Sequence, residues 1–251
     1  MEPPIFNLYT HLRSRLGPQG WWPVNRRADI PRRNDGVPLD GIARWEIMVG
    51  AVLTQNTAWR NVERALDNLR SLQSSGEGRI PGPDRFTILA GETLAERIYP
   101  AGYYNQKAKK LRILAEAVTA RDWQPWGARV PRRDEILSLW GIGDETADCM
   151  MVYAFGVPHM VVDQYKRRIL ARIAGNPGSG FPRLGGDFTA SEQMPYAELA
   201  GMLEDQLPRD VRVYNEFHAL LVRLGSLACG KRAVCASCPL GPSGSGMCRG
   251  V

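Results

Sequence analysis

The sequence lacks long apolar runs, is poor in histidine, and keeps most of its few cysteines in one place. No apolar stretch approaches the roughly 20 residues that a membrane-spanning helix needs, which excludes a transmembrane protein. The N-terminus does not resemble a signal peptide either, so we expect a cytoplasmic protein without a membrane partner. His11, His159 and His218 show no spacing typical of metal ligands, and we expect each to be structural or on the surface.

Strand patterns are also scarce, and neither internal repeats nor low-complexity segments are present. Helical periodicity is widespread instead, so we predict an all-α protein. The predicted helices span residues 42–56, 57–72, 84–90, 92–99, 105–121, 132–139, 144–155, 163–174, 191–206 and 208–227. Loops or connectors are predicted from composition at 74–83, 122–131 and 175–186.

Positive charge is in excess. The chain carries 32 Lys and Arg against 26 Asp and Glu, a formal net charge of +6. A basic balance indicates a polyanionic partner, although a solvated surface explains each single cluster of basic residues equally well. The hydrophobic fraction of 44% is ordinary, and 251 residues suffice for one large domain or two smaller ones.

Four of the five cysteines lie close together near the C-terminus. They are Cys229, Cys235, Cys238 and Cys248, separated by gaps of five, two and nine residues, while Cys149 lies far away in an apolar stretch. Thiolates are soft ligands that select zinc or iron–sulfur clusters, and such spacing lets one loop wrap around a single centre. Disulfides fit less well in a chain without a signal peptide. We therefore predict a metal site, and the spacing alone leaves zinc and [4Fe–4S] open.

A short helical hairpin is the most diagnostic backbone element. Residues 137–147 read Leu-Ser-Leu-Trp-Gly-Ile-Gly-Asp-Glu-Thr-Ala, so that a helix ends, Gly141 and Gly143 make a tight turn, and a second helix begins. The start of that helix suits a phosphate, although a plain helix connection explains the turn alone equally well. Twenty residues later, an apolar run delivers Asp163 at the start of another helix.

These motifs together resemble the helix-hairpin-helix (HhH-GPD) superfamily of DNA base-excision glycosylases. The cysteines resemble the cluster loop of its endonuclease III branch, which usually has gaps of six, two and five residues. Further motifs resemble the endonuclease III-like 3-methyladenine DNA glycosylases, whose best-known form lacks the metal loop. They are residues 21–23 (Trp-Trp-Pro), 53–57 (Leu-Thr-Gln-Asn-Thr), 102–109 (Gly-Tyr-Tyr-Asn-Gln-Lys-Ala-Lys) and 162–165 (Val-Asp-Gln-Tyr).

The resemblance implies two helical domains flanking a DNA-binding cleft. A six-helix domain would span 38–157 and carry the hairpin motif at 137–156. Residues 1–37 and 158–251 would form the second domain, with the cluster loop at 229–248. The resemblance also implies a [4Fe–4S] cluster rather than zinc, double-stranded DNA with damaged bases as the partner, a monomer, and a nucleoid location if the source is bacterial.

Asp163 occupies the superfamily's catalytic position, where a carboxylate stabilises the positive charge that develops on the deoxyribose. Helix capping is the alternative role for this aspartate. Glu145 stands where bifunctional members carry a lysine nucleophile, and a carboxylate cannot form a Schiff base. The implied enzyme is therefore monofunctional, with Lys166 as a conceivable substitute nucleophile. Glu145 also suits the first turn of a helix on electrostatic grounds alone.

Aromatic side chains are expected to hold the extruded base. We assign the base pocket to Trp21, Trp22 and Trp59, with Tyr165 at its border, because an extruded base stacks between flat surfaces. The alternative for the tryptophans is a core position, which we expect for Trp45 and Trp140.

The remaining predicted contacts are to the duplex. Gln55 aligns with the residue that fills the space the base leaves, and a surface glutamine at a helix end is the alternative. The contacts to the DNA backbone are assigned to Gly141, Gly143, Lys107, Lys231 and Arg232, and shaping the mouth of the base pocket is the alternative for Lys107.

The sequence thus predicts a monofunctional DNA glycosylase for alkylated purines. A second hypothesis keeps the class but changes the substrate to oxidised, deaminated or mismatched bases, with weak lyase activity through Lys166. A third is a non-catalytic iron–sulfur protein that binds damaged DNA.

Overall fold

The chain forms two compact units, each with its own core. The structure is a computed structural model that describes residues 3–27, 30–32, 40–73, 78–89, 91–123, 129–175 and 194–248. One unit combines Met1–Trp21 with Met160–Val251, and the other spans Trp22–His159. The second junction lies close to the expected 157/158, whereas the first lies earlier in the chain than the expected 37/38.

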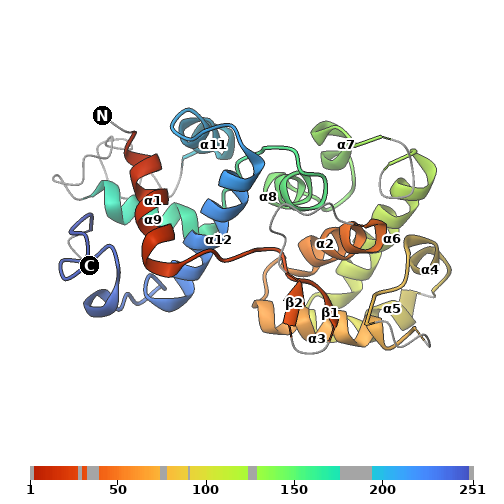
Figure 1. Ribbon diagram of the computed structural model, residues 1–251. Coiled ribbons are helices and arrows are strands. Elements are labelled where there is room, and N and C mark those ends of the chain that lie inside the picture. The colour runs from red at the N-terminus through yellow and green to blue at the C-terminus, as the bar shows by residue number, and fades with distance from the viewer. Residues whose placement is uncertain are drawn as a thin grey trace. The chain divides into compact units, whose positions relative to one another are not determined.

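The unit with both termini is built from helices α1 (Pro4–Leu16), α9 (Gln164–Ala174), α11 (Tyr196–Glu204) and α12 (Val211–Leu227). Helices α1 and α9 each pack against α12, beside which they lie in Figure 1. Leu8, Leu12, Phe217 and Leu220 are fully buried in the core that these helices share. A chain segment with one short 3₁₀ turn (Cys235–Ser237) follows α12 and carries the clustered cysteines.

The other unit packs its helices around α2 (Gly41–Leu53). The remaining helices are α3 (Trp59–Arg70), α4 (Pro83–Ile88), α5 (Gly91–Arg97), α6 (Tyr104–Ala120), α7 (Arg133–Leu137) and α8 (Asp144–Cys149). Every residue of α2 from Trp45 to Leu53 is buried, and α3, α6 and α8 contact it (Figure 1). Asp40 caps the start of α2 through a hydrogen bond from the Ala43 amide to its carboxylate (2.8 Å). This helix is therefore the centre of the unit.

The all-α prediction is confirmed, with small differences in the elements. A short antiparallel ribbon, β1 (Val24–Arg27) and β2 (Ile30–Arg32), and helix α1 were not predicted. The predicted helix 144–155 is α8 continued by a π-helical turn (Met150–Ala154). The predicted apolar face of α3 (Val62, Ala65, Leu66 and Leu69) is buried. Residues 74–77, 124–128, 176–186 and 191–193, parts of three predicted loops and one predicted helix, lie outside the described residues.

None of the helices that the structure describes combines the length and the apolar character needed to span a bilayer.

Candidate active site

The hairpin connects α7 to α8 through a turn that needs glycine at its first position. Gly141 has a φ of +80°, which disfavours any residue with a Cβ atom. A Cβ atom at this position would also lie 2.4 Å from Cε of Lys110, whose side chain crosses the turn. Gly143 is the N-cap of α8, and both glycines are exposed. The turn therefore presents bare backbone to solvent.

Ion pairs hold α8 against α7. Arg133 of α7 donates hydrogen bonds to Asp144 (2.6 Å) and to both carboxylate oxygens of Asp148 (2.6 and 2.9 Å). Asp148 is only 2% exposed, and its hydrogen bonds raise the pKa of the Arg133 guanidinium above its usual value. These ion pairs link the first residue of α7 to two residues of α8.

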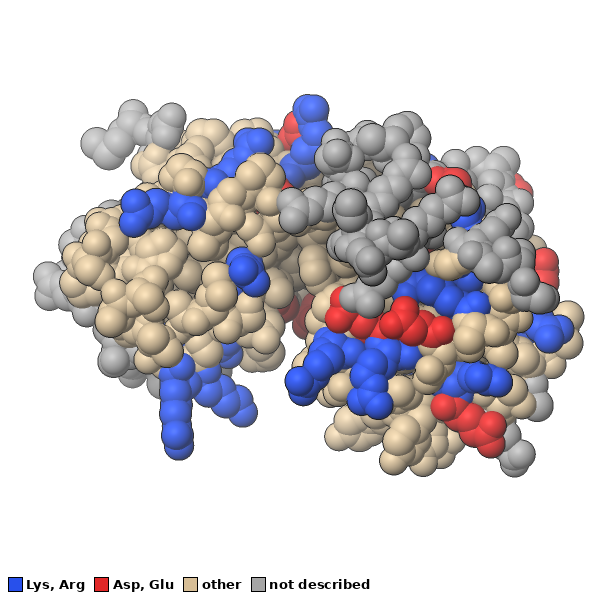
Figure 2. All heavy atoms as spheres, turned by 60° about the horizontal axis from the view of Figure 1, so that its bottom comes forward, with Lys and Arg blue, Asp and Glu red and all other residues tan. Residues whose placement is uncertain are grey.

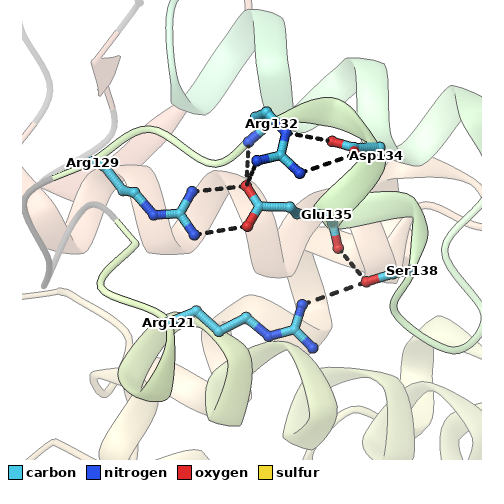
Figure 3. A network of polar contacts seen from close by, with 6 residues as sticks. All are labelled: Arg121, Arg129, Arg132, Asp134, Glu135 and Ser138. Carbon is cyan, nitrogen blue, oxygen red and sulfur yellow. Dashed lines mark hydrogen bonds and ion pairs between the residues drawn. The ribbon is translucent and has the colours of Figure 1, made fainter.

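A second polar network, drawn in Figure 3, anchors the start of α7. Arg129 grips the Glu135 carboxylate with two hydrogen bonds of 2.7 Å, and the Arg132 amide donates a third (2.9 Å). The Arg129 bonds are the main reason why the pKa of Glu135 is lowered to about 2. Arg132 pairs with Asp134 nearby. The first helix of the hairpin thus carries its own capping network.

Gln55 lies just beyond the end of α2 and reaches the hairpin. Its Nε2 donates to the Gly141 carbonyl (3.2 Å) and to the Thr146 hydroxyl (2.9 Å). Its Oε1 accepts a hydrogen bond from Nζ of Lys110 (2.6 Å). The predicted wedge residue is therefore bound to the helical hairpin of its own unit. Its role in the duplex stays a prediction.

The predicted aromatic pocket is partly assembled. Trp22 meets Trp59 edge to face (centroids 5.3 Å apart, 86°) and lies 5.4 Å from Tyr153. Trp22 is only 2% exposed and packs against Gly50, where a Cβ atom would lie 2.8 Å from the indole. Trp59 and Trp21 are partly exposed. Trp59 is therefore the member of the pair whose ring is partly accessible, and the buried Trp22 packs against it.

The two tryptophans expected in the core, Trp45 and Trp140, differ in their exposure to solvent. Trp45 is fully buried, and its indole nitrogen donates to the Pro81 carbonyl (3.0 Å). Trp140 is 49% exposed at the hairpin turn, with Nζ of Lys109 4.3 Å from its ring centroid. The prediction of a core position is therefore wrong for Trp140. The turn holds this side chain outside, where a cation covers part of it.

Asp163 is the N-cap of α9 and is 8% exposed. Its Oδ1 accepts a hydrogen bond from the Lys166 amide (2.7 Å), so Asp163 does cap the helix. A cap of this kind fixes the carboxylate in one orientation, which suits a catalytic group as well. The catalytic role of Asp163 stays a prediction at this point.

Lys166 points into the core rather than toward a substrate. The side chain is completely buried, and its amine donates to the Val161 carbonyl and to Sδ of Met160 (3.1 Å). The Phe217 ring lies 5.2 Å from the same nitrogen. A nucleophile must reach C1′ of the deoxyribose, and this amine lies in the interior instead. The placement argues against Lys166 as a substitute nucleophile.

His218 lies in the same interior region as Lys166. Its spacing in the sequence predicted only a structural or surface position. It is 7% exposed, and burial lowers the pKa of its imidazole to about 4. The Asp163 carboxylate raises this pKa and the Lys166 charge lowers it, so the three groups lie within electrostatic reach of one another. His218 is therefore neutral at pH 7 beneath the start of α9.

Tyr165 packs on α12. A Cβ atom at Gly225 would lie 2.2 Å from its ring, and the guanidinium of Arg168 lies 5.1 Å from the ring centroid. The ring is partly exposed. Its predicted place at the border of the base pocket stays a prediction.

Lys107 differs from its predicted role. Only 2% of it is exposed, and its amine donates to the carbonyls of Leu53 and Ala101, each at 2.8 Å. Burial, together with the charge of Lys110, lowers the pKa of this amine to about 8. The prediction that Lys107 contacts the DNA backbone is wrong, because its amine ties the end of α2 to the start of α6 inside the unit.

Unlike Lys107, three other charged residues of the predicted site are exposed. Lys231 and Arg232 are exposed in the cysteine segment, and Glu145 is exposed in the first turn of α8. Over the face drawn in Figure 2, Lys and Arg side chains are spread out, with Asp and Glu among them in places. The predicted phosphate contacts of Lys231 and Arg232 stay a prediction.

The four cysteine thiols are partly buried on one loop beside the core of their unit. Burial raises the pKa of the Cys238 thiol, and Cys229 and Cys248 add to this effect. In the part of the chain that the structure describes, no three His, Cys, Asp or Glu side chains are placed to hold a single metal ion. Four thiols in one half-buried loop nevertheless fit an iron–sulfur cluster by donor chemistry.

Two neighbouring features shape the cysteine loop. Arg172 of α9 donates hydrogen bonds to Sγ of Cys229 (3.1 Å) and to the Gly230 carbonyl (2.9 Å). Gly241 and Gly244 let the loop close tightly, since a Cβ atom there would lie 2.7 and 2.3 Å from backbone oxygens. The loop conformation thus depends on α9 and on two glycines as well as on the cysteines.

Comparison with known proteins identifies the family. The profile of the HhH-GPD superfamily of base excision DNA repair proteins matches residues 49–180. The Methanocaldococcus jannaschii protein MJ1434, named as an inferred DNA repair glycosylase, is 34% identical over 242 residues, covering 94% of this chain and 93% of its own. The thymine-DNA glycosylase of Aeropyrum pernix is 26% identical over 224 residues, covering 88% and 87%.

Two solved structures share the fold. The 3-methyladenine DNA glycosylase of H. pylori bound to 1,N6-ethenoadenine has a TM-score of 0.61 and 24% identity, covering 90% of this chain and 98% of that one. An endonuclease III–DNA complex has a TM-score of 0.66 and 20% identity, covering 98% and 94%. The resemblance predicted from the motifs is confirmed. The chain belongs to the HhH-GPD superfamily of base excision DNA repair proteins.

Proposed function

We propose that the protein is a monofunctional DNA glycosylase in which Asp163 is the catalytic carboxylate. The observation that carries the proposal is the placement of Asp163 as a nearly buried cap at the start of α9, within a chain of this repair superfamily. A fixed carboxylate stabilises the oxocarbenium-like sugar as the N-glycosidic bond breaks, and it orients the attacking water. Hydrolysis of this kind leaves an abasic site.

The absence of lyase chemistry rests on two residues. Glu145 carries a carboxylate in the first turn of α8, and the Lys166 amine is buried beneath α9. A Schiff base needs an uncharged amine that reaches C1′, and neither side chain supplies one. The product therefore stays an intact strand, and borohydride leaves no covalent adduct.

Alkylated purines are the proposed substrates. Trp59, backed by Trp22, offers a partly exposed indole for stacking on an extruded base. A purine alkylated at N3 or N7 is cationic, so stacking on indole favours it over a neutral base by about 0.5–2 kcal/mol. Because that base is already a good leaving group, the site needs little acid catalysis.

A second candidate substrate is a deaminated or mismatched pyrimidine. Relatives named thymine-DNA glycosylase and thymine/uracil-DNA glycosylase each match 88% of this chain, at 26% and 25% identity. Such a base is neutral, so it gains no cation–π advantage on Trp59. The two candidates therefore differ in how strongly they depend on this indole.

A [4Fe–4S] cluster held by Cys229, Cys235, Cys238 and Cys248 completes the proposal. The cluster would cross-link the loop and stiffen the segment that carries Lys231 and Arg232. These exposed cations would contact phosphates of double-stranded DNA, and the exposed turn at Gly141 and Gly143 would add backbone donors. Gln55 would fill the space that the base leaves. We propose that the protein works as a monomer.

The test is base release from methylated duplex DNA, with Asp163→Asn as the variant. Asparagine also caps helices well, so this variant keeps α9 while it removes the carboxylate charge. We expect wild type to release 3-methyladenine or 7-methylguanine and Asp163→Asn to release neither. Glu145→Gln is the matched control, because it removes an exposed carboxylate that the mechanism does not use.

Three other results would each change the proposal. Release of thymine or uracil from mismatched duplex, without release of alkylpurines, would favour the second substrate class. Tight binding to an abasic-site analogue without release of any base would favour a non-catalytic binder of damaged DNA. A colourless protein that contains zinc in place of iron and sulfide would contradict the proposed cluster.

A further inference from the structure

Lys110 is tied to the hairpin twice, by its stem and by its amine. The stem lies across Gly141, since a Cβ atom there would approach Cε, Cδ and Cγ of Lys110 to 2.4–3.0 Å. The amine donates to Oε1 of Gln55 at 2.6 Å. Both contacts originate from the middle of α6, on the side of the helix that faces the turn.

Gln55 closes the ring of contacts. Its Nε2 donates to the Gly141 carbonyl and to the Thr146 hydroxyl, and Thr146 is only 7% exposed. The amide therefore has one orientation, with its oxygen toward Lys110 and its nitrogen toward the hairpin. Three hydrogen bonds hold the side chain in this position.

This position is incompatible with the proposed work of Gln55 in DNA. An amide that enters the duplex must give its donor and acceptor to the orphaned base, and both are bound to the protein here. Burial also lowers the pKa of the Lys110 amine, as expected for a group withdrawn from water. The Lys110 bond therefore stabilises a retracted state of Gln55.

We propose that Lys110 is a specificity-determining residue that latches Gln55 onto the hairpin and so opposes its entry into the duplex. This inference rests on the proposed role of Gln55 in filling the vacated space. Binding to an intact duplex leaves the latch closed, while binding to a duplex with a vacated base position requires it to open. The latch thus lowers affinity for the second kind of DNA, and weakening it changes the ratio of the two affinities.

The experiment compares two duplexes of the same sequence, one intact and one with a tetrahydrofuran abasic analogue, by fluorescence anisotropy at fixed salt. Lys110→Met keeps the stem on Gly141 and removes the donor. We expect the affinity ratio, abasic over intact, to rise about tenfold, the lower end of the effect of a hydrogen bond to a charged group. Lys110→Arg keeps a donor and should restore a ratio near that of wild type.

Two controls separate the latch from charge and from folding. Lys109→Met removes an exposed cation one residue away, so it should lower both affinities and leave their ratio unchanged. In a Gln55→Ala background, Lys110→Met should no longer change the ratio, since nothing is left to release. Thermal unfolding of each variant checks that the hairpin unit remains folded.

The proposal is overturned if Lys110→Met leaves the ratio unchanged or lowers it, if Lys109→Met raises it as much, or if the increase persists without Gln55. A ratio of one in every variant would overturn it as well. Base release plays no part in this assay. A protein that releases no base can still show the latch, and an active glycosylase can lack it.

Discussion

Replacement of Lys107 by methionine tests whether its buried amine is structural. The amine makes two hydrogen bonds of 2.8 Å to the carbonyls of Leu53 and Ala101. Two hydrogen bonds from a charged donor contribute about 3–6 kcal/mol together. Lowering the pKa from 10.5 to about 8 corresponds to a burial cost of about 3 kcal/mol. The net contribution at neutral pH is thus small, about 0–3 kcal/mol.

The variant should nevertheless lose more than this net value. Methionine fills the space but leaves the two carbonyls without their donor, so we expect Lys107→Met to be about 2–4 kcal/mol less stable at pH 7. The difference should widen at high pH. Between pH 8 and 10.5 the unfolded wild type still holds the lysine proton that the folded protein has released, so wild-type stability rises by up to about 3 kcal/mol relative to the variant.

Urea unfolding at pH 7, 8, 9 and 10 measures both effects. Lys109→Met serves as the matched control, because Lys109 is exposed on the same helix. The salt dependence of DNA binding should be unchanged in Lys107→Met, since a buried amine releases no counterion from a phosphate. Unchanged stability at pH 7, or a loss of one phosphate contact from the salt dependence, would refute the structural role and restore the surface role.

Three further changes have defined outcomes. Glu135 has a lowered pKa because Arg129 grips it, so wild-type thermal stability should fall as pH drops from about 4.5 to 2. Glu135→Gln should lack that part of the decline, and an unchanged acid profile would contradict it. The neutral His218 should cost the fold up to about 3 kcal/mol as pH falls from 6.5 to about 4, a loss absent from His218→Gln in acid urea titrations. Gly225→Ala should destabilise by about 1–3 kcal/mol in urea unfolding, because Tyr165 occupies the space, and a stabilised variant would mean that helix propensity outweighs this contact.

Helices with a strong apolar period were predictable from sequence. In α3 the four apolar residues at three- and four-residue steps are the four that are buried. Helix α1 was not predicted, although Leu8 and Leu12 lie one turn apart. The ribbon of β1 and β2 was missed for a different reason. Strands of three or four residues are too short to show alternation.

Side-chain placement within the candidate site was less predictable than the motifs. The motifs located the hairpin correctly, because a glycine turn between helices is specified locally by backbone conformation. They gave no way to tell Trp140 from Trp45, since exposure depends on how helices pack. The hydrogen bonds of Gln55 were equally invisible, as they join segments that lie far apart in the sequence.

The lysines show why the electrostatic part of the prediction went wrong. Lys107 was expected to face phosphate and Lys166 was a conceivable nucleophile, yet both give their amines to backbone carbonyls inside the fold. Leu53 is the last residue of α2, where a helix leaves carbonyls without a backbone donor, and Val161 lies in the segment just before α9. A lysine can reach such an acceptor through a long apolar stem, at the cost of burying its charge. The net charge of +6 therefore overstates the positive charge at the surface, because both of these amines are buried, whereas Lys231 and Arg232 are exposed.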